Sequence, residues 1–284
     1  MLLKRAYEGW VAYEYYPSMV AGVIFVILFG IVTLLHTFHL FRTRTWFFIP
    51  LVIGGYFELI GYIGRCLSAS QSPNWTLGPY IMQSTLLLVA PALFAASIYM
   101  ELGRIVLLVK GEKFAIIRVT WMTKIFVAGD VLSFLMQASG AGILVTDNQS
   151  MGENVIVGGL FVQIIFFGFF VISAFVFQRR IAAHPTPESV AEYIPWKKHM
   201  GALYASSILI LVRSIFRVAE YLQGWDGSLL QSEVFIYVLD GLLMWFVMTI
   251  FLVVHPSEIN CLLGRGKLMT AKGGLQVCEA ALPV

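Results

Sequence analysis

The stretch "MGALYASSILILVRSIFRVAEY", Met200–Tyr221, is apolar enough to cross a lipid bilayer, yet it contains Arg213, Arg217 and Glu220. At about 1.5 Å per residue, a helix of about 20 residues spans a hydrocarbon core about 30 Å thick. A charged side chain at the centre of such a helix costs about 2.5–3.5 kcal/mol on insertion. The stretch therefore predicts a membrane-spanning helix whose charged side chains face other helices rather than lipid.

The composition extends this interpretation to the whole chain. Of the 284 residues, 59% are hydrophobic and 12% are charged, whereas soluble domains carry about 25% charged residues. Runs of about 18 or more apolar residues are typical of transmembrane helices, and seven such runs occur. They are residues 19–41, 46–67, 80–103, 122–145, 155–177, 200–221 and 233–254. We predict an all-α membrane protein with an N-terminal segment (1–18), a seven-helix domain (19–254) and a tail (255–284).

The distribution of basic residues predicts the orientation. Cytosolic loops of membrane proteins carry an excess of lysine and arginine. The connections after the first, third and fifth helices, together with the tail, carry nearly all of them, whereas the opposite side has Lys4 and Arg5. The basic residues of the first group are Arg42, Arg44, Arg104, Lys110, Lys113, Arg118, Lys124, Arg179, Arg180, Lys197, Lys198, Arg265, Lys267 and Lys272. We therefore expect the N-terminus outside and the C-terminus in the cytosol.

Two glycosylation sequons agree with this orientation. "NWT" begins at Asn74 and "NQS" at Asn148. Both lie in connections that the basic residues assign to the outside, where N-linked glycans are attached. We predict a glycoprotein modified at these two asparagines.

Ionisable and amide side chains recur at helical spacing inside the predicted helices. Arg213, Arg217 and Glu220 are separated by four and three residues and so share one face. The same spacing relates members of the set on the second, fourth and seventh helices. The candidate residues for substrate binding or gating are Glu58, Arg65, Gln83, Asp130, Gln137, Arg213, Arg217, Glu220, Glu233 and Asp240.

Two interpretations of this set remain open. Intramembrane ionisable residues face the bundle interior and commonly mark substrate pathways, so the set predicts a polar cavity in the outer half, with acidic groups reaching deeper. In that case the arginines of the sixth helix pair with acids on the second and seventh. Alternatively, buried ion pairs fix the register of the helices without touching a ligand.

Several chemistries lack the residues that they need. No lysine lies deeper in a predicted helix than Lys124, at the very start of the fourth, so a retinal Schiff base has no attachment point in the middle of the bilayer. His36 and His39 are three residues apart, but a zinc site needs a third ligand. The chain has neither a Walker A pattern nor GxSxG. We expect no metal, no cofactor and no enzymatic activity. Pro91 lies in the middle of the third predicted helix and predicts a kink there.

Short stretches in a fixed order resemble the fungal seven-helix lipid-translocating exporters, a family linked to resistance to aminocholesterol and to sphingoid long-chain bases. The matching stretches are "YYPS" (15–18), "ELIGYIGR" (58–65), "PYIMQSTLLLVAPALFAASIYMELGR" (79–104), "DVLSFLMQASGAGI" (130–143), "GGLFVQ" (158–163), "RSIFRVAEYLQGWDG" (213–227), "EVFIYVLDGLLM" (233–244) and "HP" (255–256). They cover most of the predicted membrane domain. Gly22 departs from the pattern, since the family is expected to have an asparagine there.

The resemblance implies a fungal membrane protein that transports amphipathic lipids and confers resistance to toxic ones. The plasma membrane is the expected location, with an endomembrane as the alternative. Its partners would be membrane lipids and an amphipathic lipid substrate, such as a sphingoid base, a related phospholipid or a sterol amine, with no nucleic acid. Some family members are linked to porphyrin or haem traffic. A seven-helix lipid sensor that signals to the cytosol is the alternative function.

Overall fold

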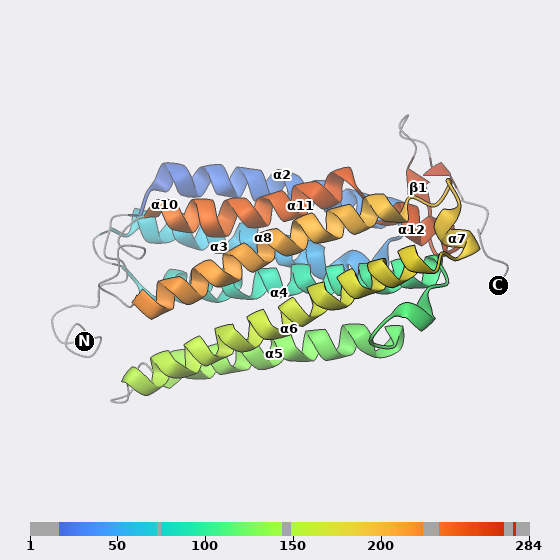
Figure 1. The fold of residues 1–284 in the computed structure, drawn as a ribbon. Coiled ribbons are helices and arrows are strands. Elements are labelled where there is room, and N and C mark those ends of the chain that lie inside the picture. Colours follow the sequence, from blue (N-terminus) through green and yellow to red (C-terminus); the bar gives the residue numbers. More distant parts are fainter. Residues whose placement is uncertain (1–16, 73–74, 144–148, 224–232, 270–274, 277–284) are drawn as a thin grey trace.

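The described part of the chain folds into seven long helices that run side by side (Figure 1). The computed structural model describes residues 17–72, 75–143, 149–223, 233–269 and 275–276. All seven helices are long and apolar enough to cross a membrane, which confirms the predicted number. They are α2 (Met19–Thr43), η1 (Trp46–Phe48) with α3 (Ile49–Ser70), α4 (Leu77–Leu108), α5 (Val119–Ile143), α6 (Gln149–Ala183), α8 (Trp196–Gln223), and α10 (Glu233–Phe235) with η3 (Ile236–Leu242) and α11 (Leu243–Val253).

Short elements gather at one end of the bundle. We call this the α12 end, at the right in Figure 1, and the opposite end, where α2 begins, the Ser18 end. The short elements are η2 (Glu112–Phe114), α7 (Pro187–Val190), α12 (Ser257–Leu262), β1 (Leu268–Met269) and β2 (Leu275–Gln276). The two strands pair antiparallel, with Leu268 opposite Gln276.

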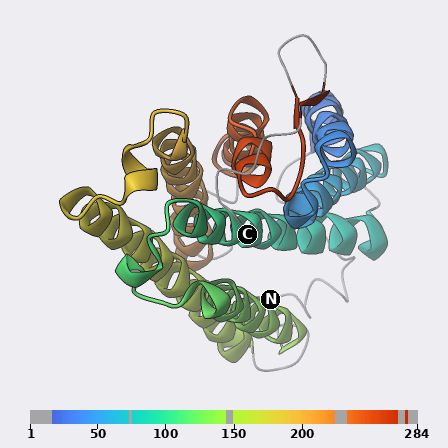
Figure 2. The same ribbon diagram turned by 90° about the vertical axis from the view of Figure 1, so that its right-hand side faces the viewer.

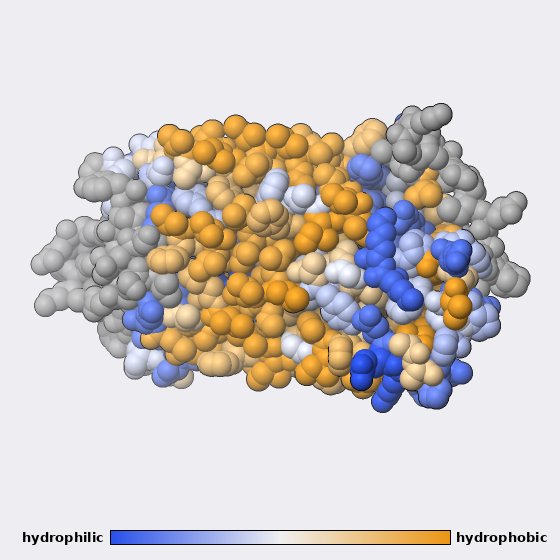
Figure 3. All heavy atoms as spheres, turned by 45° about the horizontal axis from the view of Figure 1, so that its top comes forward, coloured by the Kyte–Doolittle hydropathy of each residue, from blue (hydrophilic) through white to orange (hydrophobic). Residues whose placement is uncertain are grey.

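The outer surface of the bundle is apolar along most of its length. Figure 3 shows a broad hydrophobic band with hydrophilic residues beyond it at the α12 end. Large side chains on this band are well exposed, among them Leu135 on α5 and Ile165 on α6, at 58% and 65% of their maximum. Such a surface suits contact with lipid rather than water. The chain is therefore a multi-pass membrane protein.

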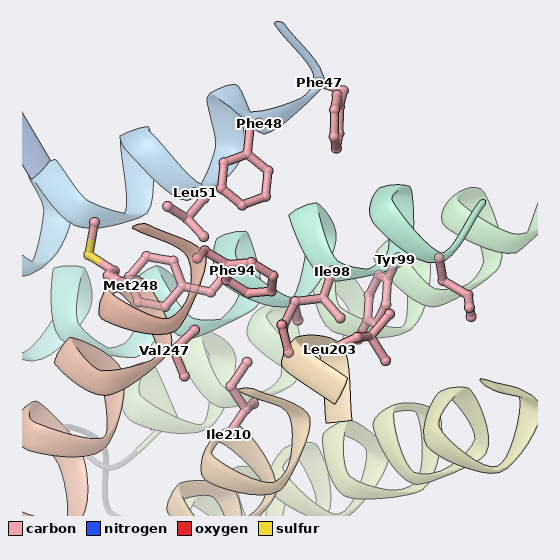
Figure 4. Close-up of a cluster of buried hydrophobic side chains, with 14 of the residues drawn as sticks. Phe47, Phe48, Leu51, Phe94, Ile98, Tyr99, Leu203, Ile210, Val247 and Met248 are labelled. Carbon is pink, nitrogen blue, oxygen red and sulfur yellow. The ribbon is translucent and has the colours of Figure 1, made fainter. Parts of the chain in front are cut away.

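Helix α4 occupies the centre of the bundle. Seen from the α12 end, it lies between α2 and α3 on one side and α5 and α6 on the other (Figure 2). It packs most extensively on α3, where Gly54 permits a close approach: a Cβ there would lie 2.7 Å from a ring carbon of Phe94. Side chains of α3, α8 and α11 surround it (Figure 4). The labelled core residues are Phe47, Phe48, Leu51, Phe94, Ile98, Tyr99, Leu203, Ile210, Val247 and Met248.

Helices α5 and α6 form a hairpin at one side of the bundle (Figure 1). They pack closely on each other because glycines remove side chains from their contact: a Cβ on Gly140 would lie 2.8 Å from the carbonyl oxygen of Gly152. The pair meets the other helices mainly through contacts of α5 with α4 and of α6 with α8. This arrangement leaves a seam between α4 and the hairpin.

The segment after the last span folds back onto the bundle. Nη1 of Arg104 on α4 donates to Oδ1 of Asn260 on α12 at 2.9 Å, and the backbone N–H of Lys267 donates to the carbonyl of Thr43 at 3.0 Å. A triad of side chains adds to these contacts: the buried His199 lies 3.1 Å from the buried Glu101 and 3.0 Å from the half-buried Glu258. The part of the predicted tail up to Met269 is thus anchored to α2, α4 and α8.

Candidate functional site

Near the Ser18 end, Arg65 of α3 binds the start of the last span. Its Nη2 lies 2.7 Å from Oε1 of Glu233, and its Nε donates to the hydroxyl of Tyr237 at 2.8 Å. That hydroxyl donates in turn to Glu233 at 3.1 Å. The backbone N–H of Ser18 completes the group by donating to both oxygens of Glu233, at 2.9 and 3.0 Å. The group ties α2, α3 and α10 together.

Deeper in the bundle, Asp240 lies between two arginines of α8. Nε of Arg213 contacts one carboxylate oxygen of Asp240, and Nη2 of Arg217 contacts the other. Nη1 of Arg217 also lies 2.9 Å from Oε2 of Glu220. We call these four residues the α8 network. Its charges are largely buried, so each depends on its partners for the stabilisation that water would otherwise supply.

Pro91 explains a further contact of Arg213. Proline has no backbone N–H, so the carbonyl four residues earlier in a helix loses its usual donor. That carbonyl belongs to Leu87, and Nη2 of Arg213 donates to it at 2.8 Å. The proline in α4 thus supplies an acceptor for an arginine of α8. One guanidinium joins three helices, because it also contacts Asp240 of the last span.

We expect Arg213→Lys to destabilise the protein. A single ammonium cannot reproduce the two separate contacts of a guanidinium with Asp240 and with Leu87. A buried carbonyl left without a donor costs about 1–3 kcal/mol. Unfolding by sodium dodecyl sulfate in mixed micelles measures the loss.

The control is Arg180→Lys, because Arg180 also donates to a backbone carbonyl, that of Phe114, at an exposed site. This variant is expected to unfold as the wild type does. Equal stability of Arg213→Lys and wild type would contradict the role given to the Leu87 carbonyl.

The last span contains a rare helical form where the charges meet. Residues Ile236–Leu242 wind as a π-helix between α10 and α11, a form that occurs mostly as single-turn bulges inside α-helices and is frequent at functional sites. The segment directs Tyr237 to Arg65 and Asp240 to α8. Its Gly241 lies against α3: a Cβ there would be 2.0 Å from the hydroxyl oxygen of Tyr62.

Glu58 faces the α8 network from α3 but makes no ion pair within the described part of the chain. It is 1% exposed and interacts electrostatically with Asp240, Arg213 and Arg217. Its Oε1 has no hydrogen-bond partner among the described residues. The expectation that the arginines pair with acids on both the second and the seventh helix is therefore met by Asp240, while for Glu58 it is wrong.

Asp130 lies apart from these charges, in a pocket in the seam between α4 and the α5–α6 hairpin. It stands near the middle of α5 and accepts a hydrogen bond from the hydroxyl of Tyr99 at 3.0 Å. Gln137 donates to Ser133 at 2.8 Å, and Oε1 of Gln137 has no partner among the described residues. The pocket is lined by Leu88, Val89, Ala92, Asp130, Ser133, Phe134, Gln137 and Gln163. A carboxylate and two amides thus meet apolar side chains at the depth of the hydrocarbon.

The candidate residues therefore form separate groups rather than one outer cavity. Arg65 and Glu233 form one group, the α8 network with Glu58 a second, and the pocket with Asp130 and Gln137 a third. Gln83 is buried on α4 and does not line the pocket.

Three features of the structure were not predicted from the sequence. Tyr99 and the Leu87 carbonyl bind candidate residues from α4. The position of Pro91 was a usable signal for the carbonyl, because a mid-helix proline always leaves one without its donor. The triad of His199, Glu101 and Glu258 was also missed, since its members come from three distant segments.

Asn74 and Asn148 of the sequons lie outside the described residues. Within the described ranges, no three histidine, cysteine, aspartate or glutamate side chains come together as a metal site would require.

Seven membrane-spanning helices with ion pairs between them and a carboxylate in a side pocket define a multi-pass membrane protein with charged groups inside its bundle. The chain belongs to the family described as RTA1 like protein, whose model matches residues 51–261. This agrees with the resemblance seen in the sequence.

Three relatives from Saccharomyces cerevisiae indicate the range of the family. Protein RTA1 is 36% identical over 277 residues, covering 88% of this chain and 86% of the relative. Protoporphyrin uptake protein 1 is 38% identical over 284 residues, covering 86% and 91%. Sphingoid long-chain base transporter RSB1 is 25% identical over 278 residues, covering 85% and 72%. No solved structure matches the chain.

Proposed function

We propose that the protein moves amphipathic lipids with a cationic amine headgroup, such as sphingoid long-chain bases, across the membrane. The observation that carries the proposal is Asp130, a carboxylate in a side pocket near the middle of α5. The outer surface of the hairpin is apolar, with Leu135 and Ile165 strongly exposed. In this proposal the lipid enters the pocket from the bilayer.

The chemistry of the pocket matches both parts of such a lipid. An ammonium group alone in hydrocarbon is costly, and the carboxylate of Asp130 offers it an ion pair at that depth. The hydroxyl groups of a sphingoid base could bond to Gln137 and Gln163, and Oε1 of Gln137 lacks a partner within the described part of the chain. The alkyl tail could lie along Leu88 and Phe134 and continue into the lipid.

The names of two relatives support transport of small amphipathic molecules, one a sphingoid base and the other protoporphyrin. A porphyrin carries carboxylates and would need basic groups. The residues that line the pocket include no lysine or arginine, and in the described part of the chain Arg213 and Arg217 are already paired with carboxylates. The pocket therefore favours an amine over a porphyrin.

We also propose the further substrates of the protein, the membrane in which it acts and its orientation there. Related phospholipids and sterol amines are further substrates of the same amphipathic kind, and removing them from a leaflet would confer resistance. The protein acts as a transporter rather than an enzyme, in the plasma membrane of a fungus, with the Ser18 end outside and the α12 end in the cytosol. Asn74 and Asn148 are glycosylated on the outer side.

The proposal is tested by transbilayer movement of a fluorescent sphingoid base in liposomes that contain the purified protein. We expect the wild type to move the lipid and Asp130→Asn to move it about 10–100-fold more slowly, because a hydrogen bond to a charged group contributes about 1.5–3 kcal/mol. The control Glu192→Gln makes an equivalent change at an exposed site and should move lipid at the wild-type rate.

Two outcomes would redirect the proposal. Equal movement by the wild type and Asp130→Asn would keep the translocator but exclude Asp130 from the path. No movement by folded wild-type protein would contradict transport and favour the seven-helix lipid sensor.

A further inference from the structure

The charges around Asp240 do not balance in the interior of the bundle. Arg213 and Arg217 supply two positive charges, whereas Asp240, Glu220 and Glu58 supply three carboxyl groups. A buried charge without compensation costs several kcal/mol. The group therefore needs one more cation, and a proton on one carboxyl group is the smallest that can serve.

Glu58 is the carboxyl group placed to hold that proton. Asp240 and Glu220 each contact an arginine, but Glu58 contacts neither. The groups facing it are Asp240 from η3, Arg213 and Arg217 from α8, and Tyr62 from its own helix. A neutral carboxylic acid suits a site with no ion pair far better than a carboxylate does.

We propose that Glu58 is a proton-binding site and that the protein exchanges this proton for the cationic amine that it carries. The inference rests on the proposed function and adds the source of energy for transport. With the proton bound, Glu58 and the α8 network together are neutral. When the proton leaves, they carry one net negative charge, which one other monovalent cation can balance, and an alkylammonium headgroup in the pocket of Asp130 is such a cation.

Two tyrosines, Tyr62 and Tyr237, follow Glu58 towards the Ser18 end. Tyr62 lies one helical turn along α3, and its ring stacks on that of Tyr237 with centroids 6.1 Å apart. The Tyr62 hydroxyl is buried without a partner among the described residues. The Tyr237 hydroxyl donates to Glu233, whose side chain is 16% exposed. Small movements of these hydroxyl groups would let a proton pass between Glu58 and the outer solution.

The pocket of Asp130 and the carboxyl group of Glu58 lie on opposite sides of α4. Leu87 faces the network, since its carbonyl binds Arg213 and its side chain lies against Gly61 of α3. The next residue, Leu88, lines the pocket of Asp130. The wall between the two sites is thus the segment of α4 that Pro91 weakens by removing a backbone hydrogen bond. Movement of this segment would couple binding of the proton at Glu58 to binding of the amine in the pocket of Asp130.

The test uses a fluorescent long-chain lipid with a trimethylammonium headgroup, whose charge cannot be lost by deprotonation. In liposomes holding the wild-type protein, we expect movement at equal pH on both sides, which tests the proposed function alone. For one-for-one exchange, a one-unit pH difference should shift the distribution of the lipid by about tenfold towards the acidic side. Glu58→Gln should lose this shift, while Glu58→Asp, which keeps the acid, should retain it.

Wild-type movement that ignores the pH difference would overturn the exchange and leave the translocator intact. A full shift in Glu58→Gln would overturn the assignment to Glu58. Absence of any movement by the wild type would refute both the function and the exchange that rests on it.

Infrared difference spectroscopy gives a readout that does not depend on transport. Adding a long-chain amine to purified wild type should remove the carbonyl stretch of a protonated carboxylic acid. The part of this loss that belongs to Glu58 should be absent from Glu58→Gln and shifted in Glu58→Asp, which separates it from any part that belongs to Asp130. A band that Glu58→Gln leaves unchanged would assign the proton to another group and contradict the proposal.

Discussion

Asp240→Asn is expected to lower the free energy of unfolding by about 3–5 kcal/mol, the usual cost of removing one partner from a buried ion pair. The loss should reach the upper part of this range because Asp240 is the shared partner of Arg213 and Arg217. An amide keeps the shape of the side chain but cannot balance two guanidinium charges. Unfolding by sodium dodecyl sulfate in mixed micelles measures the change.

Two further variants separate charge from shape. Asp240→Asn combined with Arg217→Met removes one surplus positive charge, so it should recover part of the loss. Glu233→Gln removes a carboxylate that is partly exposed and faces a single arginine, so its effect should be smaller than that of Asp240→Asn. If Asp240→Asn unfolded at the wild-type detergent fraction, the α8 network would not hold the bundle together.

The second large effect is expected at Gly241. A methyl group there would lie 2.0 Å from the Tyr62 hydroxyl oxygen and 2.7 Å from a ring carbon of Phe25. Both rings are buried and stacked on each other, so neither can turn aside without disturbing the other. Overpacking of this kind costs about 1–3 kcal/mol. We expect Gly241→Ala to lose about 3 kcal/mol in the same unfolding assay and to displace the adjacent Asp240.

Gly168→Ala is the matched control, because nothing lies within 4 Å of the Cβ that it would add on α6. Alanine is the better helix former, so this variant should be as stable as the wild type or slightly more so. Equal stability of the Gly241→Ala and Gly168→Ala variants would show that a methyl group fits between η3 and α3 without overpacking.

The helices could be predicted from the sequence better than their ends. Hydropathy located all seven spans because the apolar band is continuous in each. It underestimated the lengths of α4 and α6, which run over Leu77–Leu108 and Gln149–Ala183, because polar end residues dilute the apolar signal. A helix that continues beyond the hydrocarbon leaves no mark in hydropathy.

The pairing of the charged side chains was harder to predict from the sequence than the helices were. Helical spacing placed Glu233 and Asp240 on one face, yet they bind arginines of different helices. The π-helix between Ile236 and Leu242 changes the rotation of the chain between them, and no propensity scale marks such a segment. Glu58 looked like a partner for the arginines because sequence gives its depth but not the direction of its side chain.

The contact between α8 and the last span also has a consequence for synthesis of the protein. Asp240 follows Arg217 by 23 residues and Arg213 by 27, so α8 leaves the ribosome before the carboxylate that its two arginines share. Arg217 already has Glu220 within α8, but until Asp240 arrives Arg213 adds about 2.5–3.5 kcal/mol to the insertion of α8 alone. We expect the nascent α8 to wait at the translocon and to enter the bilayer together with α11, as a hairpin that is already neutralised.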